Sequence, residues 1–166
     1  KKMTNSTLFE LSSPPLWVTE RTRAGLDSLY FALCYEGPPS VNRIIRGRKS
    51  RSSAAFFDEA AAALQFPEYF GENWSAFEDC FRDLNGIYPL PHLIFVNQAS
   101  QLLAEEDEML QVFLDIVNET SKQWLTPDVR RNRGSIPLKL ILQEDSANMP
   151  ILLARLAATG VSSAVL

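Results

Sequence analysis

The sequence predicts an α/β fold in which a small parallel β-sheet of three strands is packed by helices. Short apolar runs of strand length alternate along the chain with longer segments whose apolar residues recur at helical spacing. A chain of 166 residues, 46% hydrophobic and 22% charged, fits one ordinary globular domain with extensions. Because strands separated by helices are joined by right-handed crossovers, the helices should cover the faces of the sheet.

The first 40 residues form an N-terminal extension in this interpretation. Residues 1–18 have no clear periodicity, and the Ser-Ser-Pro-Pro run at 12–15 acts as a breaker. Thr19 is a candidate N-cap for a helix over 19–33, although residues 29–35 would serve equally well as a strand. A Gly-Pro-Pro run at 37–39 then interrupts the chain.

The central segment, residues 41–143, should supply the three strands and the helices between them. The strands are expected at 41–46, 93–96 and 138–142. The first central helix should start at Ser52 or Ser53, either of which can cap it, and should end near residue 64. Its apolar stripe consists of Phe56, Phe57, Ala60, Ala63 and Leu64.

The next helix, expected over 73–84 after a loop at 67–72, has two unlike faces. Its apolar face consists of Trp74, Phe77, Phe81 and Leu84. At 100° per residue, the opposite side collects Glu72, Ser75, Asp79 and Asp83. An acidic side of this kind is commonly just solvated surface, and an acid near a helix N-terminus also complements the helix dipole.

A long helix expected over 104–122 repeats the arrangement. The residues expected to face inward are Met109, Leu110, Phe113, Ile116 and Val117. Those on the other side are Glu108, Gln111, Asp115 and Glu119. The two acidic faces are either two separate solvated surfaces or two halves of one acidic patch. A turn at 86–91 precedes the second strand, and a polar loop at 126–136 precedes the third.

Residues 144–166 form a C-terminal extension that is expected to pack on the same domain. A helix over 149–158 should end at Gly160, which takes the position just after the last helical turn. Residues 161–166 are a candidate fourth strand at the edge of the sheet.

Charge and hydropathy narrow the classes of partner. The net charge is −4 and the pI about 5.1, whereas domains that bind nucleic acid are commonly basic, so nucleic acid is not the expected partner. Basic side chains gather in only two short segments, at 43–51 and 130–133. No stretch is long and apolar enough to span a membrane and no run of signal-peptide type is present, so we expect a cytoplasmic protein without a membrane partner.

Two cysteines and one histidine leave few routes to metal or nucleophilic chemistry. Cys34 and Cys80 lack the spacing of a metal motif and are expected to be buried, reduced thiols. His92 alone cannot build the common triads or zinc sites. Asp79 and Asp115 could form a carboxylate pair for acid–base chemistry, but no phosphate loop or nucleophile elbow accompanies them. We therefore expect no metal, no cofactor and no enzymatic activity.

The segment 66–80 contains a specific motif: Pro-Glu-Tyr-aromatic-Gly-Glu-Asn at 67–73, then an apolar residue, then Asp79-Cys80 on the helix. In this pattern the segment resembles the barstar family of ribonuclease inhibitors. A second match is Leu-Gln-Val-Phe at 110–113, followed by Asp115 and Glu119 at the spacing of the family's acids. The resemblance covers roughly residues 42–143.

The resemblance implies a barstar-like fold and a binding surface made by the loop and the helix after it. Members of the family plug a ribonuclease active site with acids that occupy the place of substrate phosphates. Carried over position by position, the implied contacts are Tyr69, Gly71, Asn73, Trp74, Ser75, Asp79, Asp115 and Glu119. Asp79 takes the position of the family's central acid. Ser75 stands where barstar has an acid, Glu78 replaces an aromatic, and Arg82 and Asp83 replace small residues.

We therefore expect an intracellular inhibitor, of the kind that gives immunity in a toxin–antitoxin pair, that binds a basic nuclease or another cationic protein. The missing acid at Ser75 and the added Arg82 favour a target other than barnase. Two alternatives are left open: an interaction module of the same fold without a nuclease target, and a nucleic-acid-binding module that uses residues Arg43, Arg46, Arg48, Lys49 and Arg51. The sequence does not determine the oligomeric state.

Overall fold

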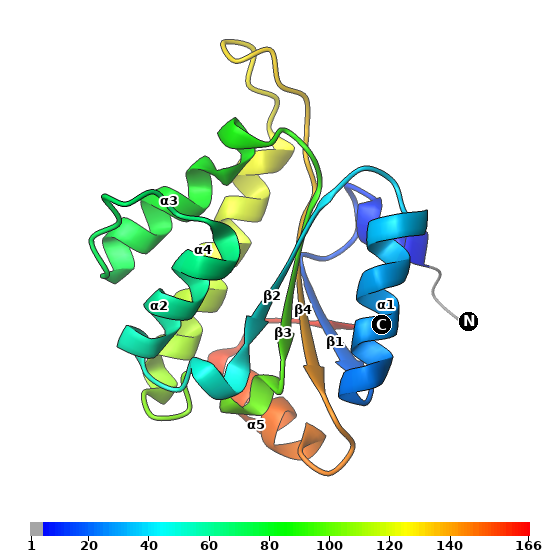
Figure 1. Cartoon of the computed structure of the whole chain (residues 1–166), viewed down its shortest axis with the longest axis vertical. Helices are drawn as coiled ribbons and strands as arrows, with labels where there is room; N and C mark the ends of the chain where they lie inside the picture. The colour runs from blue at the N-terminus through cyan, green and yellow to red at the C-terminus, as the bar shows by residue number, and fades with distance from the viewer. Residues whose placement is uncertain (1–4) are drawn as a thin grey trace.

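A parallel five-stranded sheet lies between one helix on one face and four helices on the other (Figure 1). The computed structural model describes residues 5–166. The strands, in the spatial order β2-β3-β4-β1-β5, are β1 (Leu16–Glu20), β2 (Val41–Arg46), β3 (His92–Asn97), β4 (Leu138–Glu144) and β5 (Ala164–Val165). The helices are α1 (Arg23–Glu36), α2 (Ser53–Leu64), α3 (Trp74–Ile87), α4 (Asp107–Leu125) and α5 (Met149–Thr159). The predicted α/β class with a parallel sheet is confirmed.

Strand β1 was not predicted, because residues 16–18 were interpreted as part of a loose N-terminus; residues 1–4 of that segment lie outside the described residues. The strand lies between β4 and β5, with Leu16 opposite Leu140 and Trp17 opposite Ala164. A strand covered on both faces carries no alternation, so periodicity alone misses a run this short. The predicted cap at Thr19 and the strand alternative for 29–35 are both wrong. Helix α1 starts after Thr22, whose hydroxyl accepts a hydrogen bond from the Gly25 amide at 3.1 Å.

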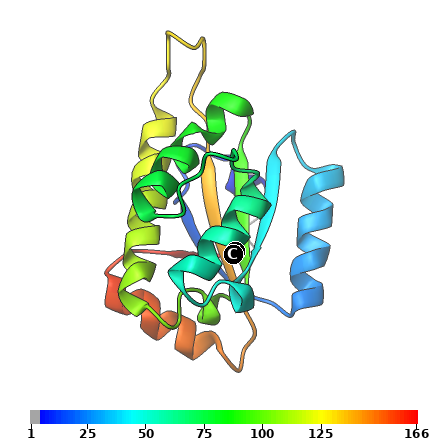
Figure 2. The same ribbon diagram turned by 60° about the vertical axis from the view of Figure 1, so that its left-hand side comes forward.

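The sheet separates two hydrophobic cores. On one face, α1 packs against alternate side chains of the strands, among them Trp17, Phe95 and Ile141. On the other face lie α2, α3, α4 and α5 (Figure 2). They enclose the larger core, which includes Leu140 and Phe113. Both faces of the sheet are therefore dry, as is usual where parallel strands are joined by helical crossovers.

The predicted helices are present, but several of their ends differ. Asn73 caps α3, which runs one turn beyond the expected end at residue 84 and includes Gly86. Helix α4 occupies 107–125 instead of 104–122, because the short 3₁₀ turn η3 (Ala99–Gln101) and a left-handed Leu103 come first. Gly160 ends α5 with a positive φ of 69°, and the predicted edge strand in 161–166 is present as β5.

Buried polar groups mark where the sequence pattern was least informative. His92 is 1% exposed, and its Nδ1 donates to the Leu90 carbonyl at 2.8 Å. Lys139 is 2% exposed on β4 and donates to the Ser13 carbonyl at 2.6 Å, and burial lowers its pKa to about 8. The two thiols are free, but the prediction that both are buried is wrong: Cys34 is exposed and Cys80 is half-buried.

No helix within residues 5–166 is long and apolar enough to span a membrane.

Candidate partner-binding site

The loop before α3 holds one large aromatic side chain out of the core. The Phe70 amide closes a turn on the Pro67 carbonyl at 3.0 Å, and the Phe70 ring packs edge-on against Phe57 at 5.9 Å. Its neighbour Tyr69 is 83% exposed. The turn and the packed Phe70 ring therefore hold in place the backbone that carries the exposed Tyr69 side chain.

Asn73 and Gly71 shape the start of α3. The Asn73 side-chain oxygen accepts the Ala76 amide at 2.9 Å, which caps the helix, and its Nδ2 donates to the Gly71 carbonyl at 3.0 Å. Glu72 between them has a positive φ of 49°. Both ends of the Asn73 amide are therefore used inside the chain, so this expected contact residue acts mainly by positioning the loop.

Trp74 lies at the rim between the core and the surface. Its ring stacks on Phe56 with centroids 5.4 Å apart, and its Nε1 donates to the Ser53 hydroxyl at 3.3 Å. That hydroxyl also contacts the Glu106 carboxylate, which accepts the Ser53 amide at 3.1 Å as well. The indole is thus fixed by a polar chain from α2 to the start of α4, and one side of it is left facing solvent.

Helices α3 and α4 enclose a groove of about 420 Å³ between their outer faces. We call it the acidic groove; its lining residues are Trp74, Ser75, Glu78, Val112, Asp115, Ile116 and Glu119. The structure therefore brings together four of the expected contact residues, from two helices distant in sequence. Glu78, Val112 and Ile116 were not expected there. The sequence carried a signal for these residues. Ser75 and Glu78 have the spacing of one helix side, and so do Val112, Ile116 and Glu119.

Asp79 is exposed on α3 and does not line the acidic groove. It follows Glu78 by one position, which turns its side chain about 100° around the helix. Tyr69 and Gly71 are likewise exposed on the preceding loop. The expected residues consequently form a surface that runs from the loop along α3 to the groove, rather than a single concave pocket.

The acids of this surface differ in how far their charge is already neutralised. Glu78 pairs with Arg82 one turn along α3, and Glu119 pairs with Lys122 at 2.7 Å. Within residues 5–166, Asp79 and Asp115 make no ion pair. The pKa of the Cys80 thiol, next to Asp79 on α3, is raised, by burial first and then by the charges of Asp79 and Asp83. Of the acids expected in the contact set, Asp79 and Asp115 are therefore the two that form no ion pair within residues 5–166.

The first basic cluster is partly neutralised inside the chain. The Arg46 guanidinium binds both oxygens of Glu59, at 2.7 and 2.8 Å, and this lowers the pKa of the Glu59 carboxyl. Arg51 pairs with Glu105 at 3.0 Å. These contacts leave fewer cations for phosphate groups than the sequence count suggests, which weakens the nucleic-acid-binding alternative.

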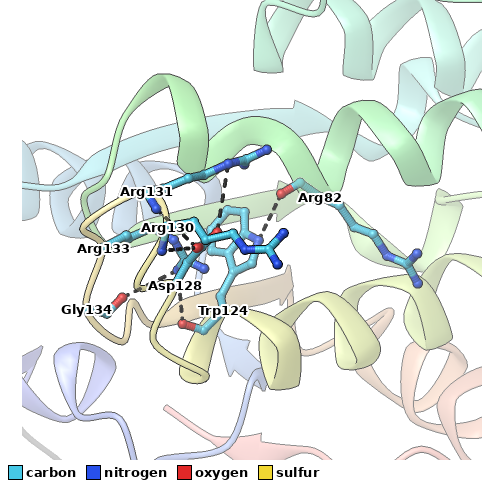
Figure 3. A network of polar contacts seen from close by, with 7 residues as sticks. All are labelled: Arg82, Trp124, Asp128, Arg130, Arg131, Arg133 and Gly134. Atoms are coloured by element: carbon cyan, nitrogen blue, oxygen red, sulfur yellow. Dashed lines mark hydrogen bonds and ion pairs between the residues drawn. The ribbon is translucent and has the colours of Figure 1, made fainter.

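The second basic cluster lies on a hairpin that projects from the ends of α3 and α4 (Figure 3). Asp128 and Arg133 exchange backbone hydrogen bonds of 2.8 and 2.9 Å. The Arg133 side chain donates to the Trp124 carbonyl at 3.3 Å, and the Trp124 indole donates to the Arg82 carbonyl at 3.0 Å. Arg133 is therefore a structural residue that ties the hairpin to α4, whereas Arg130 and Arg131 are exposed.

No group of three metal-ligating side chains occurs within residues 5–166.

Residues 41–143 match the sequence model of one protein family, described as barstar, the barnase inhibitor. The chain belongs to the barstar family. The match spans the three central strands, the loop with Tyr69, and both helices of the acidic groove. Strands β1 and β5, which complete the sheet of this barstar-family chain, lie outside it. No curated protein matches the chain significantly.

Solved structures that resemble the chain are larger proteins. Cdc6p from Pyrobaculum aerophilum aligns with a TM-score of 0.57 at 16% identity, over 91% of this chain and 38% of that protein. The Aeropyrum pernix ORC2 protein in its ADPNP–ADP complexes aligns with a TM-score of 0.54 at 10% identity, over 97% of this chain and 43% of that protein. The barstar-family chain spans less than half of either, and at these identities the likeness concerns the fold alone. The connection from β1 to α1, residues 21–22, holds no glycine-rich phosphate loop.

Proposed function

We propose that the chain is an inhibitor that blocks the cationic active site of a ribonuclease, or of a related nuclease toxin, with the surface formed by the 67–73 loop, α3 and α4. One observation carries the proposal. Within the segment that matches the barstar family, Asp79 and Asp115 are exposed on neighbouring helices and make no ion pair, and Tyr69 is exposed on the loop before α3.

The chemistry of nucleases explains why such a surface would inhibit one. A ribonuclease site is cationic because it binds a phosphodiester and stabilises negative charge that develops during cleavage. Carboxylates held on two helices can satisfy those cations, yet they offer no bond to cleave. Opposite charge also speeds encounter, which matters when the target is toxic to the cell that makes it.

The pairing of charges on α3 supports a target other than barnase. Arg82 neutralises Glu78, and Ser75 supplies a hydroxyl where barstar has an acid. Both changes reduce the negative charge at the acidic groove, so the matching surface on the partner needs fewer cations there. As an inhibitor, the chain would act as a binding protein without catalytic activity. The partner that we propose is a basic nuclease rather than a nucleic acid.

The proposal is tested by inhibition of purified cationic ribonucleases, barnase among them, in a fluorogenic RNA-cleavage assay. The decisive variant is Asp79→Ala. If Asp79 is desolvated against a cation, its loss should weaken binding by about 2–5 kcal/mol, because the partner's charge is left buried and unpaired. That range is the one known for interface charge pairs such as those of barnase–barstar, rather than a value calculated for this chain.

The matched control is Asp27→Ala on α1, which removes an exposed helical aspartate on the opposite face of the sheet. Glu105→Ala is a poorer control, because Glu105 pairs with Arg51. Both aspartate variants should keep the wild-type free energy of unfolding within about 0.5 kcal/mol. Inhibition that is equal for wild type and folded Asp79→Ala would refute the proposed surface, and inhibition of no ribonuclease would refute the function.

A further inference from the structure

A second cavity, of about 440 Å³, lies on the other side of α4 from the acidic groove. We call it the terminal cavity, because the two ends of the chain enclose it against α4. Three segments form its walls: residues 14–16 before and in β1, one side of α4, and residues 159–162 at and after the end of α5. The α4 residues are Leu114, Asp115, Val117 and Asn118. Residues 14–16 and 159–162 lie outside the segment that matches the barstar family, so these additions build a hollow that the family segment lacks.

The chemistry of the lining favours a cation with an aliphatic stem. The acidic group is Asp115, and no lysine, arginine or histidine is among the lining residues. Within residues 5–166, the side chains of Asp115, Asn118 and Ser162 make no hydrogen bond. The rest of the wall consists of proline, leucine and valine side chains together with Thr159 and Gly160. A carboxylate with free hydroxyl and amide groups above apolar walls suits the charged head and the methylene chain of an arginine or lysine side chain.

Asp115 connects the two hollows, since it lines the terminal cavity and the acidic groove alike. On its groove side lies Glu119, and on its cavity side lies Asn118. A protein bound over α3 and α4 would therefore continue across Asp115 onto the terminal cavity without crossing a basic residue. The negative charge of Asp115 acts on both sides of α4, at distances well within the Debye length of physiological salt.

We propose that the terminal cavity receives a cationic side chain, arginine or lysine, of the same protein partner that covers the acidic groove. This inference rests on the proposed function for the identity of the partner, while the cation preference of the cavity stands on its own lining. The extensions of the chain thereby widen the family's interface from the α3 side of α4 to the terminal side.

The cation preference is tested directly with agmatine, which carries a guanidinium and an ammonium at the two ends of an aliphatic chain. Agmatine is titrated into the full-length protein and followed by ¹H–¹⁵N NMR. The amides of Leu16, Asn118 and Val161 should shift in a saturable way, and those of α1 should not. Asn118→Arg places a cation in the cavity and should weaken agmatine binding by at least about tenfold. An arginine introduced on α1, Ser28→Arg, is the control and should leave agmatine binding unchanged.

The partner's use of the cavity is tested with Ser162→Trp, which fills the cavity, against Ser163→Trp, which adds the same side chain one position outside its lining. For a ribonuclease that the protein inhibits, Ser162→Trp and Asn118→Arg should each raise the inhibition constant about tenfold or more, and Ser163→Trp should not.

The outcomes separate this inference from the proposed function. If agmatine shifts no cavity amide, the terminal cavity is not a cation site, whatever the ribonuclease result. If agmatine binds but Ser162→Trp and Asn118→Arg inhibit like wild type, the partner does not use the cavity, while the proposed function stands. If no ribonuclease is inhibited by wild type, the proposed function fails, the partner's part of the inference fails with it, and the agmatine titration alone judges the cation site.

Discussion

Protonation of His92 should destabilise the fold between pH 6.5 and 4. The Nδ1–H of the ring donates to the Leu90 carbonyl, and Nε2 is buried without a hydrogen-bond partner. The ring packs edge-on against Trp124, with centroids 4.9 Å apart. A proton on Nε2 would place a charge in this dry site, so burial, aided by the nearby charge of Arg43, lowers the pKa of His92 to about 4.

The direction and size of the effect follow from the difference between the folded and unfolded pKa values. An unfolded histidine has a pKa near 6.5, so below that pH the unfolded state binds a proton that the folded state refuses. Stability is fully present above pH 6.5 and falls as the pH approaches 4. With the folded pKa of about 4, the loss is about 2 kcal/mol at pH 5 and about 3 kcal/mol near pH 4.

Urea unfolding at pH 7 and pH 5, followed by tryptophan fluorescence, measures the effect. His92 is the single histidine of the chain, so no other imidazole titrates in this window. Measurements at or above pH 5 also avoid protonation of Glu59. Because the pKa of Glu59 is lowered, its stabilising ion pair with Arg46 is lost only in more acidic solution. His92→Phe, which keeps a ring against Trp124, should lose most of the pH dependence. Two results would contradict the reasoning: a decrease in the free energy of unfolding between pH 7 and pH 5 that is as large in His92→Phe as in wild type, or no decrease in wild type.

Two further predictions concern packing and are checked by urea unfolding at pH 7. Phe77→Ala should cost about 3–5 kcal/mol, because the ring is fully buried and packs against six other aromatic rings. Tyr69→Ala, on an exposed side chain, should cost under about 0.5 kcal/mol, and equal costs would mean that the aromatic core is misplaced. Gly47→Ala should cost about 1–3 kcal/mol, because its Cβ would lie 2.3 Å from the Gln98 carbonyl oxygen, whereas Gly134→Ala meets nothing within 4 Å and should be nearly neutral.

The sequence alone was sufficient for the inner and outer sides of the two site helices. Phe77 and Phe113 are buried, and Asp79 and Asp115 are exposed, as their helical spacing predicted. This works because a long amphipathic helix repeats its signal over several turns, so one face must be buried wherever the helix packs. The loop motif before α3 likewise pointed to the barstar family, which the match over 41–143 confirms.

The arrangement of these faces was decided by tertiary structure. Strand β1 was missed because a five-residue strand covered on both sides has no period, and its place between β4 and β5 depends on partners more than 100 residues away in sequence. The same long-range pairing brings residues 14–16 and 159–162 together against α4 and so creates the terminal cavity beside Asp115. Local spacing determines which side of a helix is apolar, but only the pairing of distant strands determines which surfaces become neighbours, and a binding site made of such neighbours is invisible until the chain has folded.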